Sequence, residues 1–175
     1  MGRIFVERCI VIFPDFDNIE ILNDIRRKYD PLYSFIKPHI TLVFPFESEL
    51  PAEEIEAHIR SAVINTAPFE LVMKGITVNP DPVENYIFLN VIKGMQEIRG
   101  LSKALYTGIL GKYKSELYNT YLPHITIGRV GKNADCERIK GDIGHGETEF
   151  AALVERVSVE ALDGNKSFTE MTISL

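Results

Sequence analysis

The chain has 175 residues, of which 45% are hydrophobic and 25% are charged. This mixture can form a buried core, and it excludes an intrinsically disordered chain. No stretch approaches about 18 consecutive apolar residues, so we expect no membrane span, and the N-terminus lacks the pattern of a signal peptide. Two cysteines, Cys9 and Cys136, are too few for a disulfide framework. Together these features predict a cytoplasmic protein.

The formal net charge is −6. Proteins that coat long nucleic acids through phosphate contacts usually carry a basic face, so we expect no such coating here. An acidic total still permits a small anionic ligand held by a few local groups. The sequence shows no heptad repeat or large apolar patch. It leaves the oligomeric state open, with a monomer as the working expectation.

Segments of strand and helix character alternate along the chain without linkers or low-complexity tracts. In chain order we predict a strand over 3–13, a helix over 18–29, a strand over 35–45, a helix over 51–63, strands over 69–79 and 85–93, a helix over 95–109, a strand over 121–130, a short helix from about Ala134 capped by Asn133, and strands near 149–161 and 167–175. The order is βαβαβ followed by βαβαββ. Two halves of similar layout indicate an internal duplication, so we expect one domain over 1–175 with lobes of about 1–80 and 81–175.

One pentapeptide occurs twice, once in each half. Residues 38–42 read Pro-His-Ile-Thr-Leu, and residues 123–127 read Pro-His-Ile-Thr-Ile. Each copy falls in the second predicted strand of its half, where alternate side chains share a face. The histidine and threonine of each copy therefore point away from the aliphatic residues, which belong in a core. If the two strands are related by a twofold axis, both polar pairs face one cleft.

Two histidines and two threonines that face each other suit phosphodiester chemistry. Displacement at phosphorus needs a base for the attacking oxygen and an acid for the leaving oxygen. Histidine has an unperturbed pKa of about 6.5, so that one copy can be neutral and the other charged near pH 7. Threonine hydroxyls can donate to the nonbridging oxygens. The predicted catalytic residues are His39, His124, Thr41 and Thr126. Nothing in this arrangement requires a metal or another cofactor.

The duplicated motif resembles the 2H phosphoesterases, also called the 2′-5′ RNA ligase-like or cyclic phosphodiesterase superfamily. The resemblance implies an α+β fold that is bilobal and pseudo-twofold, with duplicated βαβαβ halves whose antiparallel-rich sheets form a central cleft flanked by helices. It also implies a metal-independent phosphodiesterase, a hydrolase acting on 2′,3′-cyclic or 2′-5′ linkages of RNA ends or nucleotides. His39 and His124 would be the acid/base pair, in an order that the sequence does not decide, and Thr41 and Thr126 would hold the phosphate.

Five further residues are candidates for substrate binding. Arg129 is a candidate phosphate-binding cation or a simple surface charge. Strict alternation places it on the aliphatic face of its strand, so it must either reach around the strand end or lie past a bulge, which Gly128 permits. Lys37, just before the first motif, could serve similarly. Tyr86 and Phe88 share one face of a predicted strand, where an aromatic ring could stack on a base or simply join the core. Tyr121, near the second motif, is equally ambiguous.

Other functions stay open at this level. Ligation of long RNA would favour a broad basic surface, so the acidic composition favours hydrolysis of a smaller substrate over 2′-5′ RNA ligase activity. A non-catalytic module that binds a nucleotide or phosphometabolite on the same fold is a further alternative, as is a protein-interaction role. A metal site built from Asp142, His145 and Glu147 has no recognised ligand spacing, and we do not predict one.

Overall fold

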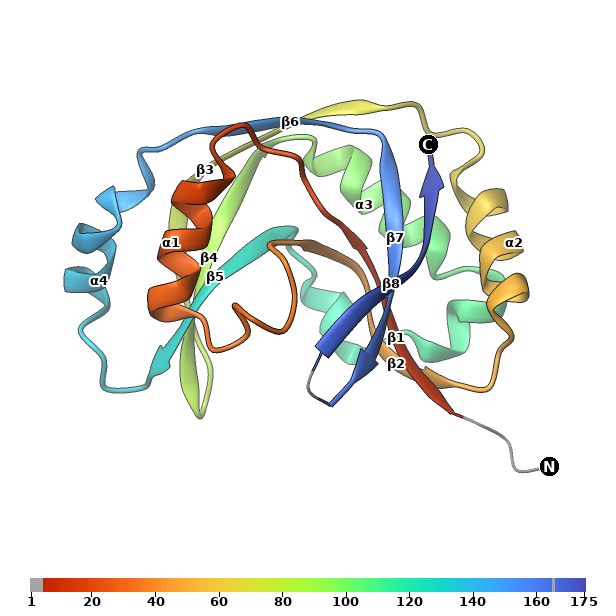
Figure 1. Ribbon diagram of the computed structural model, residues 1–175, viewed down its shortest axis with the longest axis horizontal. Coiled ribbons are helices and arrows are strands. Elements are labelled where there is room, and N and C mark those ends of the chain that lie inside the picture. Colours follow the sequence, from red (N-terminus) through yellow and green to blue (C-terminus); the bar gives the residue numbers. More distant parts are fainter. Residues whose placement is uncertain (1–4, 165) are drawn as a thin grey trace.

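In the computed structural model, which describes residues 5–164 and 166–175, eight strands form a single curled sheet (Figure 1). The strands are β1 (Val6–Ile12), β2 (Ile40–Ser48), β3 (Phe69–Pro80), β4 (Glu84–Lys93), β5 (His124–Gly131), β6 (Phe150–Val154), β7 (Arg156–Asp163) and β8 (Lys166–Ser174). Their order across the sheet is β6-β3-β4-β5-β2-β1-β7-β8, and every neighbouring pair is antiparallel. The fold is therefore α+β, as predicted.

The helices pack on the sheet through amphipathic faces. They are α1 (Ile19–Tyr29), α2 (Ala52–Val63), α3 (Met95–Leu105) and α4 (Cys136–Asp142), with short 3-10 turns η1 (Gly108–Tyr113), η2 (Glu116–Thr120) and η3 (Gly144–Gly146). α1 contacts β5, and α3 contacts β2. Figure 1 shows α1 and α4 beside β4 and β5, and α2 at the opposite end of the molecule. In the described part of the chain, none of the helices is long and apolar enough to cross a membrane.

The sheet is symmetric about the contact between β2 and β5. On one side the order runs outward as β2-β1-β7-β8, and on the other as β5-β4-β3-β6. Each side combines strands from both predicted lobes, because β3 from 1–80 pairs with β4 from 81–175, and β7 pairs with β1. The two sequence segments are thus interleaved in space, while their second strands meet at the centre.

The central strands bury their aliphatic residues against the helices. Ile40, Leu42, Ile125 and Ile127 are 0–1% exposed. The Ser102 hydroxyl of α3 donates a 2.6 Å hydrogen bond to the Leu42 carbonyl, which ties α3 to β2. Burial of this face leaves the opposite face of β2 and β5 for the polar half of each motif.

The segment before the first motif is not a strand. The sequence predicts a strand over 35–45, but β2 begins at Ile40 and residues 31–35 form turns. Arg26 and Asp30, buried at the end of α1, form an ion pair of 2.8 Å. The Arg26 Nη2 also donates to the Ile36 carbonyl at 2.9 Å, so this side chain holds the segment in a compact loop.

Three other predicted boundaries also shift. The helix predicted over 95–109 ends at Leu105, because Gly108 has a φ of +53° and starts a 3-10 turn. The strand predicted near 149–161 is two strands, since β6 pairs with β3 and β7 pairs with β1 at distant positions in the sheet. The cap of α4 is Asp135, whose side chain accepts from the Arg138 amide, and Asn133 does not cap it. Residues 3 and 4 of the first predicted strand lie outside the described residues.

Candidate active site

The two motifs meet at the centre of the sheet. The antiparallel register of β2 and β5 pairs Ile40 with Ile125. Extended by one residue in one direction, it sets His39 opposite Thr126. In the other direction it sets Thr41 opposite His124. Directly opposed residues in an antiparallel pair share a face, so all four polar side chains lie on the face away from the buried isoleucines. The shared face predicted from the pentapeptide is present.

Both histidines are held in the same way. His39 Nδ1 lies 2.8 Å from the Lys37 carbonyl oxygen, and His124 Nδ1 lies 2.7 Å from the Leu122 carbonyl oxygen. A carbonyl oxygen can only accept, so Nδ1 of each ring carries the hydrogen. The proton that can be gained or lost is then on Nε2, the nitrogen on the far side of each ring. Two equivalent strands therefore present two equivalent Nε2 atoms.

The surroundings lower the pKa of both imidazoles. Burial lowers the pKa of His39 from 6.5 to about 4, and the positive charge of Arg26 lowers it further. The bond to the Lys37 carbonyl and the negative charge of Asp30 oppose this shift. Burial also lowers the pKa of His124, again opposed by its carbonyl partner. The surroundings therefore favour the neutral form of both rings in the free protein. A bound anion would favour the charged form and raise these pKa values.

The aromatic neighbours of the two histidines differ. The Phe88 ring stacks on His124, with ring centroids 3.6 Å apart and an angle of 24° between the planes. Phe13 meets His39 edge to face, with centroids 6.3 Å apart. One face of the Phe88 ring is therefore covered by the His124 imidazole. The local symmetry of the motifs does not extend to the side chains around them.

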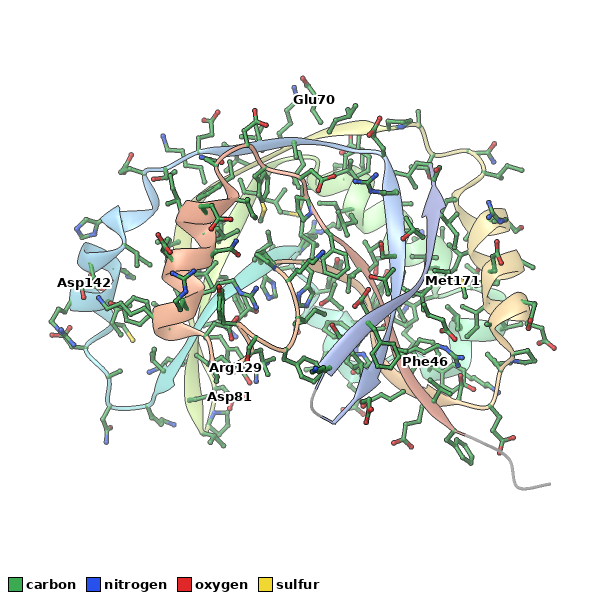
Figure 2. All side chains as sticks on the ribbon, in the orientation of Figure 1. Phe46, Glu70, Asp81, Arg129, Asp142 and Met171 are labelled. Atoms are coloured by element: carbon green, nitrogen blue, oxygen red, sulfur yellow. The ribbon has the colours of Figure 1, made fainter. Side chains whose placement is uncertain are left out.

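A bulge brings Arg129 to the face of the histidines. In the β4–β5 pairing, Phe88 lies opposite Thr126 and Ile87 lies opposite Gly128, so Ile127 is an extra residue. The extra residue reverses the alternation, and Arg129 lies opposite Tyr86 with its guanidinium 5.2 Å from the centre of that ring. Figure 2 shows the Arg129 side chain beside β4 and β5. Its Nε is buried and has no hydrogen-bond partner among the residues described.

The two remaining candidates lie near the first motif. The Tyr121 hydroxyl donates a 2.6 Å hydrogen bond to the Thr41 carbonyl, and burial raises the pKa of this phenol. Tyr121 therefore holds the strand of the first motif in place, and its hydroxyl proton is engaged by the Thr41 carbonyl. The Lys37 side chain is exposed and extends into a cavity that adjoins His39 on the side of Phe13.

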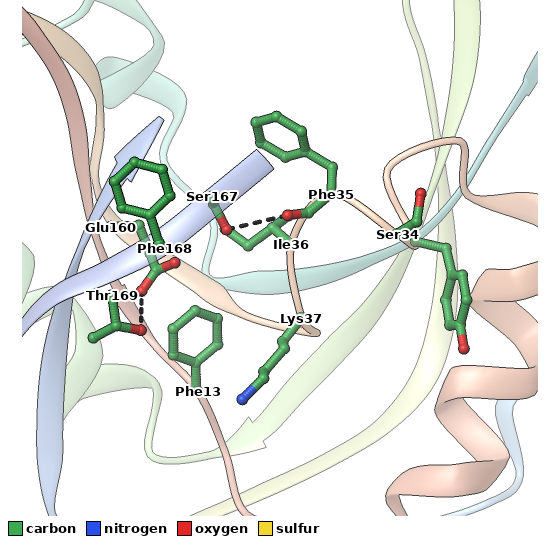
Figure 3. Close-up of a pocket in the computed structure, with 10 residues that line it drawn as sticks. Phe13, Ser34, Phe35, Ile36, Lys37, Glu160, Ser167, Phe168 and Thr169 are labelled. Atoms are coloured by element: carbon green, nitrogen blue, oxygen red, sulfur yellow. Dashed lines mark hydrogen bonds between the residues drawn. The ribbon is translucent and has the colours of Figure 1, made fainter. Parts of the chain in front are cut away.

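This cavity has a volume of about 370 Å³ and lies over β7, β8 and the loop before the first motif (Figure 3). Its walls are Phe13, Tyr33, Ser34, Phe35, Ile36, Lys37, Glu160, Ser167, Phe168 and Thr169. Neither histidine is part of the wall, but Phe13 contacts the His39 ring. The sequence analysis missed Glu160 and the β8 residues, because only the long-range pairing of β7 with β1 brings them to the motif.

No metal site accompanies these residues in the described ranges, where no group of three or more His, Cys, Asp or Glu side chains is arranged to hold an ion. Asp142, considered from the sequence, instead accepts a 2.9 Å hydrogen bond from the Tyr29 hydroxyl. His145 is exposed in η3.

The curled antiparallel sheet carries a His-x-Thr motif at each of its two central strands. This is the arrangement that the resemblance to the 2H phosphoesterases led us to expect. The chain also matches the family model of the 2′-5′ RNA ligase superfamily over residues 14–166. It therefore belongs to this superfamily of 2H phosphoesterases, as the paired motifs predicted.

Relatives and solved structures agree with this assignment. A Bacillus pumilus protein named "Putative phosphoesterase" is 33% identical over 148 residues, which cover 84% of each chain. A similarly named Bacillus cytotoxicus protein is 31% identical over 150 residues, covering 84% of this chain and 83% of that one. The crystal structure of E. coli LigT with 3′-AMP matches with a TM-score of 0.65 at 17% identity, covering 98% of this chain and 99% of that chain. Kluyveromyces marxianus Usb1 with uridine monophosphate matches with a TM-score of 0.52 at 9% identity, over 97% and 98%. These two structures show a shared fold.

Proposed function

We propose that the chain is a metal-independent phosphodiesterase that opens 2′,3′-cyclic phosphates, or cleaves 2′-5′ linkages, of nucleotides or RNA ends. The observation that carries the proposal is the equivalence of the two histidines across the β2–β5 contact, each with its Nδ1 bonded to a carbonyl and its Nε2 left for proton transfer. The complexes of LigT with 3′-AMP and of Usb1 with uridine monophosphate support a substrate of this class.

The reaction needs one proton removed and one proton supplied. Water attacks the phosphorus of the cyclic phosphate and gives a proton to the Nε2 of the neutral histidine. The bond from phosphorus to one ribose oxygen breaks, and that oxygen takes the Nε2 proton of the charged histidine. The product is a phosphomonoester, and the two histidines end with exchanged protonation states.

The threonines and one cation would stabilise the phosphate. The hydroxyls of Thr41 and Thr126 lie on the same face as the histidines and can donate to the nonbridging oxygens as negative charge accumulates. Arg129, brought to this face by the bulge, would assist from the β4 side. Because the pKa of both histidines is lowered in the free protein, binding of the anionic substrate would itself recharge the acid.

The test is turnover of the four nucleoside 2′,3′-cyclic monophosphates, of oligonucleotides that end in a cyclic phosphate, and of 2′-5′ dinucleotides, with excess EDTA. We expect hydrolysis by the native chain and a loss of about 10²–10⁴-fold in the His39→Asn variant, in which the amide can still donate to the Lys37 carbonyl. Inhibition by EDTA would contradict the proposal. Tight nucleotide binding without turnover would instead favour a binding module, and joining of 2′-5′ ends would favour a ligase.

A further inference from the structure

We propose that the cavity beside the first motif is the base subsite of the enzyme and that it selects guanine, through Glu160 and Lys37. The preferred substrate would then be guanosine 2′,3′-cyclic phosphate or an RNA end that terminates in guanosine. This inference rests on the proposed function, because it places the phosphate of the nucleotide at the two histidines.

The strand pairing puts Glu160 on the face of the catalytic motif. Val11 of β1 lies opposite Thr41 of β2, so these residues share a face. Cys9, two residues earlier on β1, shares that face and lies opposite Glu160 of β7. The strand of Glu160 is two strands from that of His39, about 10 Å across the sheet. Its partner Cys9 lies three residues from Ile12, the partner of Ile40, so Glu160 is also offset by about 10 Å along the strands. Because Phe13, which contacts the His39 ring, lines the same cavity as Glu160, a nucleoside with its phosphate at His39 would extend the far edge of its base through this cavity toward Glu160.

Glu160 is a buried carboxylate whose surroundings leave it free to accept hydrogen bonds. The residue is 2% exposed, yet its side chain forms part of the cavity wall. Among the described residues its one hydrogen-bond partner is the Thr169 hydroxyl, which donates to Oε1 at 2.5 Å. A buried carboxylate is costly unless it is hydrogen-bonded, and a ligand that donates hydrogen bonds would stabilise it. The charge and the position of Glu160 thus favour a ligand that presents several hydrogen-bond donors along one edge.

Guanine has the edge that these groups match. Its N1–H and N2–H₂ groups are adjacent donors, which one carboxylate can accept together, and its O6 beside them is an acceptor. Lys37 lines the same cavity and can donate to O6 (Figure 3). Adenine would place its N6 donor toward the lysine, and uracil offers one donor between two acceptors. A carboxylate and an ammonium group that line one cavity would therefore discriminate among the bases by hydrogen bonding.

Aromatic residues and a fixed rim complete the subsite. In the view of Figure 3 the Glu160 carboxyl group lies between the rings of Phe168 and Phe13, which offer apolar surface to a planar base. Phe168 is 52% exposed, as expected of a ring that a ligand would cover. Ser167 fixes the rim, because its amide and its hydroxyl both donate to the Phe35 carbonyl, at 3.1 and 3.2 Å. The volume of about 370 Å³ lies in the range of small-molecule sites.

The experiment compares the four nucleoside 2′,3′-cyclic monophosphates by kcat/KM, and binding of guanosine and adenosine 3′-monophosphates by calorimetry. The native chain should prefer guanosine by about tenfold or more over each other base. Glu160→Gln replaces one acceptor with a donor, so it should lower the ratio of guanosine to adenosine at least tenfold in both measurements. Lys37→Gln, at an exposed position, should lower the same ratio even if the Glu160 variant fails to fold.

Glu47→Gln is the matched control, since it makes the same change of charge at an exposed position on β2 and should leave the ratio unchanged. Turnover of all four nucleotides at equal rates, or an unchanged ratio in the Glu160 and Lys37 variants, would overturn the inference while leaving the proposed function intact. Guanosine 3′-monophosphate binding that depends on Glu160 without any turnover would support the base subsite and reject the proposed hydrolysis.

Discussion

Each histidine ring of the site is oriented by a nearby backbone carbonyl. The carbonyl two residues earlier, from Lys37 or Leu122, fixes the ring tautomer and its orientation without help from a carboxylate. A carboxylate partner would raise the pKa of an imidazole, whereas a neutral carbonyl does so less, and burial here prevails. Both environments therefore favour the neutral ring in the free protein. This arrangement suits a site in which either ring can serve as the base.

The lowered pKa of His39 predicts that the protein loses stability in acid. Below pH 6.5 the unfolded chain binds a proton that the folded His39 does not bind until about pH 4, so the free energy of unfolding falls as the pH falls through this window. The loss from this residue is at most about 3 kcal/mol. Urea denaturation at about pH 7 and about pH 4.5 measures it, and His39→Asn should show a smaller decrease. An equal decrease in both proteins would contradict the lowered pKa.

The bulge in β5 acts at the scale of the element. It lets Ile127 and Gly128 both face the helices, and it returns Arg129 to the face of the motif. Close packing against α1 accompanies it, because a Cβ at Gly128 would lie 3.1 Å from the Cβ of Tyr29 and 3.2 Å from Cδ1 of Ile87. The bulge thus depends on a residue without a side chain at this point of contact.

This packing predicts different effects for two glycines of the same strand. Gly128→Ala should destabilise the protein by about 1–3 kcal/mol, since the contact with α1 has no space for a methyl group. Gly131→Ala is the control, because nothing lies within 4 Å of its added Cβ, and its effect should stay within about 0.5 kcal/mol. Denaturant unfolding of both variants decides the matter. Equal stabilities would show that the helix moves aside freely.

The sequence predicts the site better than it predicts its surroundings. The pentapeptide specifies both strand position and side-chain face, so His39 and His124 could be placed by alternation alone. For Arg129 the sequence leaves two routes open, a bulge at Gly128 or a reach around the strand end, and the structure has the bulge. The break between β6 and β7 could not be foreseen, because the strands separate to pair with β3 and β1, which is a long-range event. Glu160 reaches the cavity beside the first motif through the same pairing.

At the scale of the molecule, the strand order is symmetric about the two histidines, but the residues on the two sides of them differ. On the β4 side of the histidines lie Arg129 and Tyr86, whose cation and ring are stacked. On the β1 side lies the cavity that contains Lys37 and the buried carboxylate of Glu160. The duplicated strands supply two equivalent imidazoles, and the residues on the two sides of this pair differ. A substrate with a phosphate at the centre and a base on one side fits this division.

The measurement that tests the paired-histidine account most directly is kcat/KM against pH for the native chain and for His39→Asn and His124→Asn, on one 2′,3′-cyclic nucleotide. The native profile should be bell-shaped with its optimum below pH 6.5, because the pKa of both rings is lowered. Each variant should lose about 10²–10⁴-fold in rate, and each should lose a different limb of the bell. Variants that keep both limbs, or that lose less than about tenfold, would contradict the assignment of the two imidazoles as acid and base.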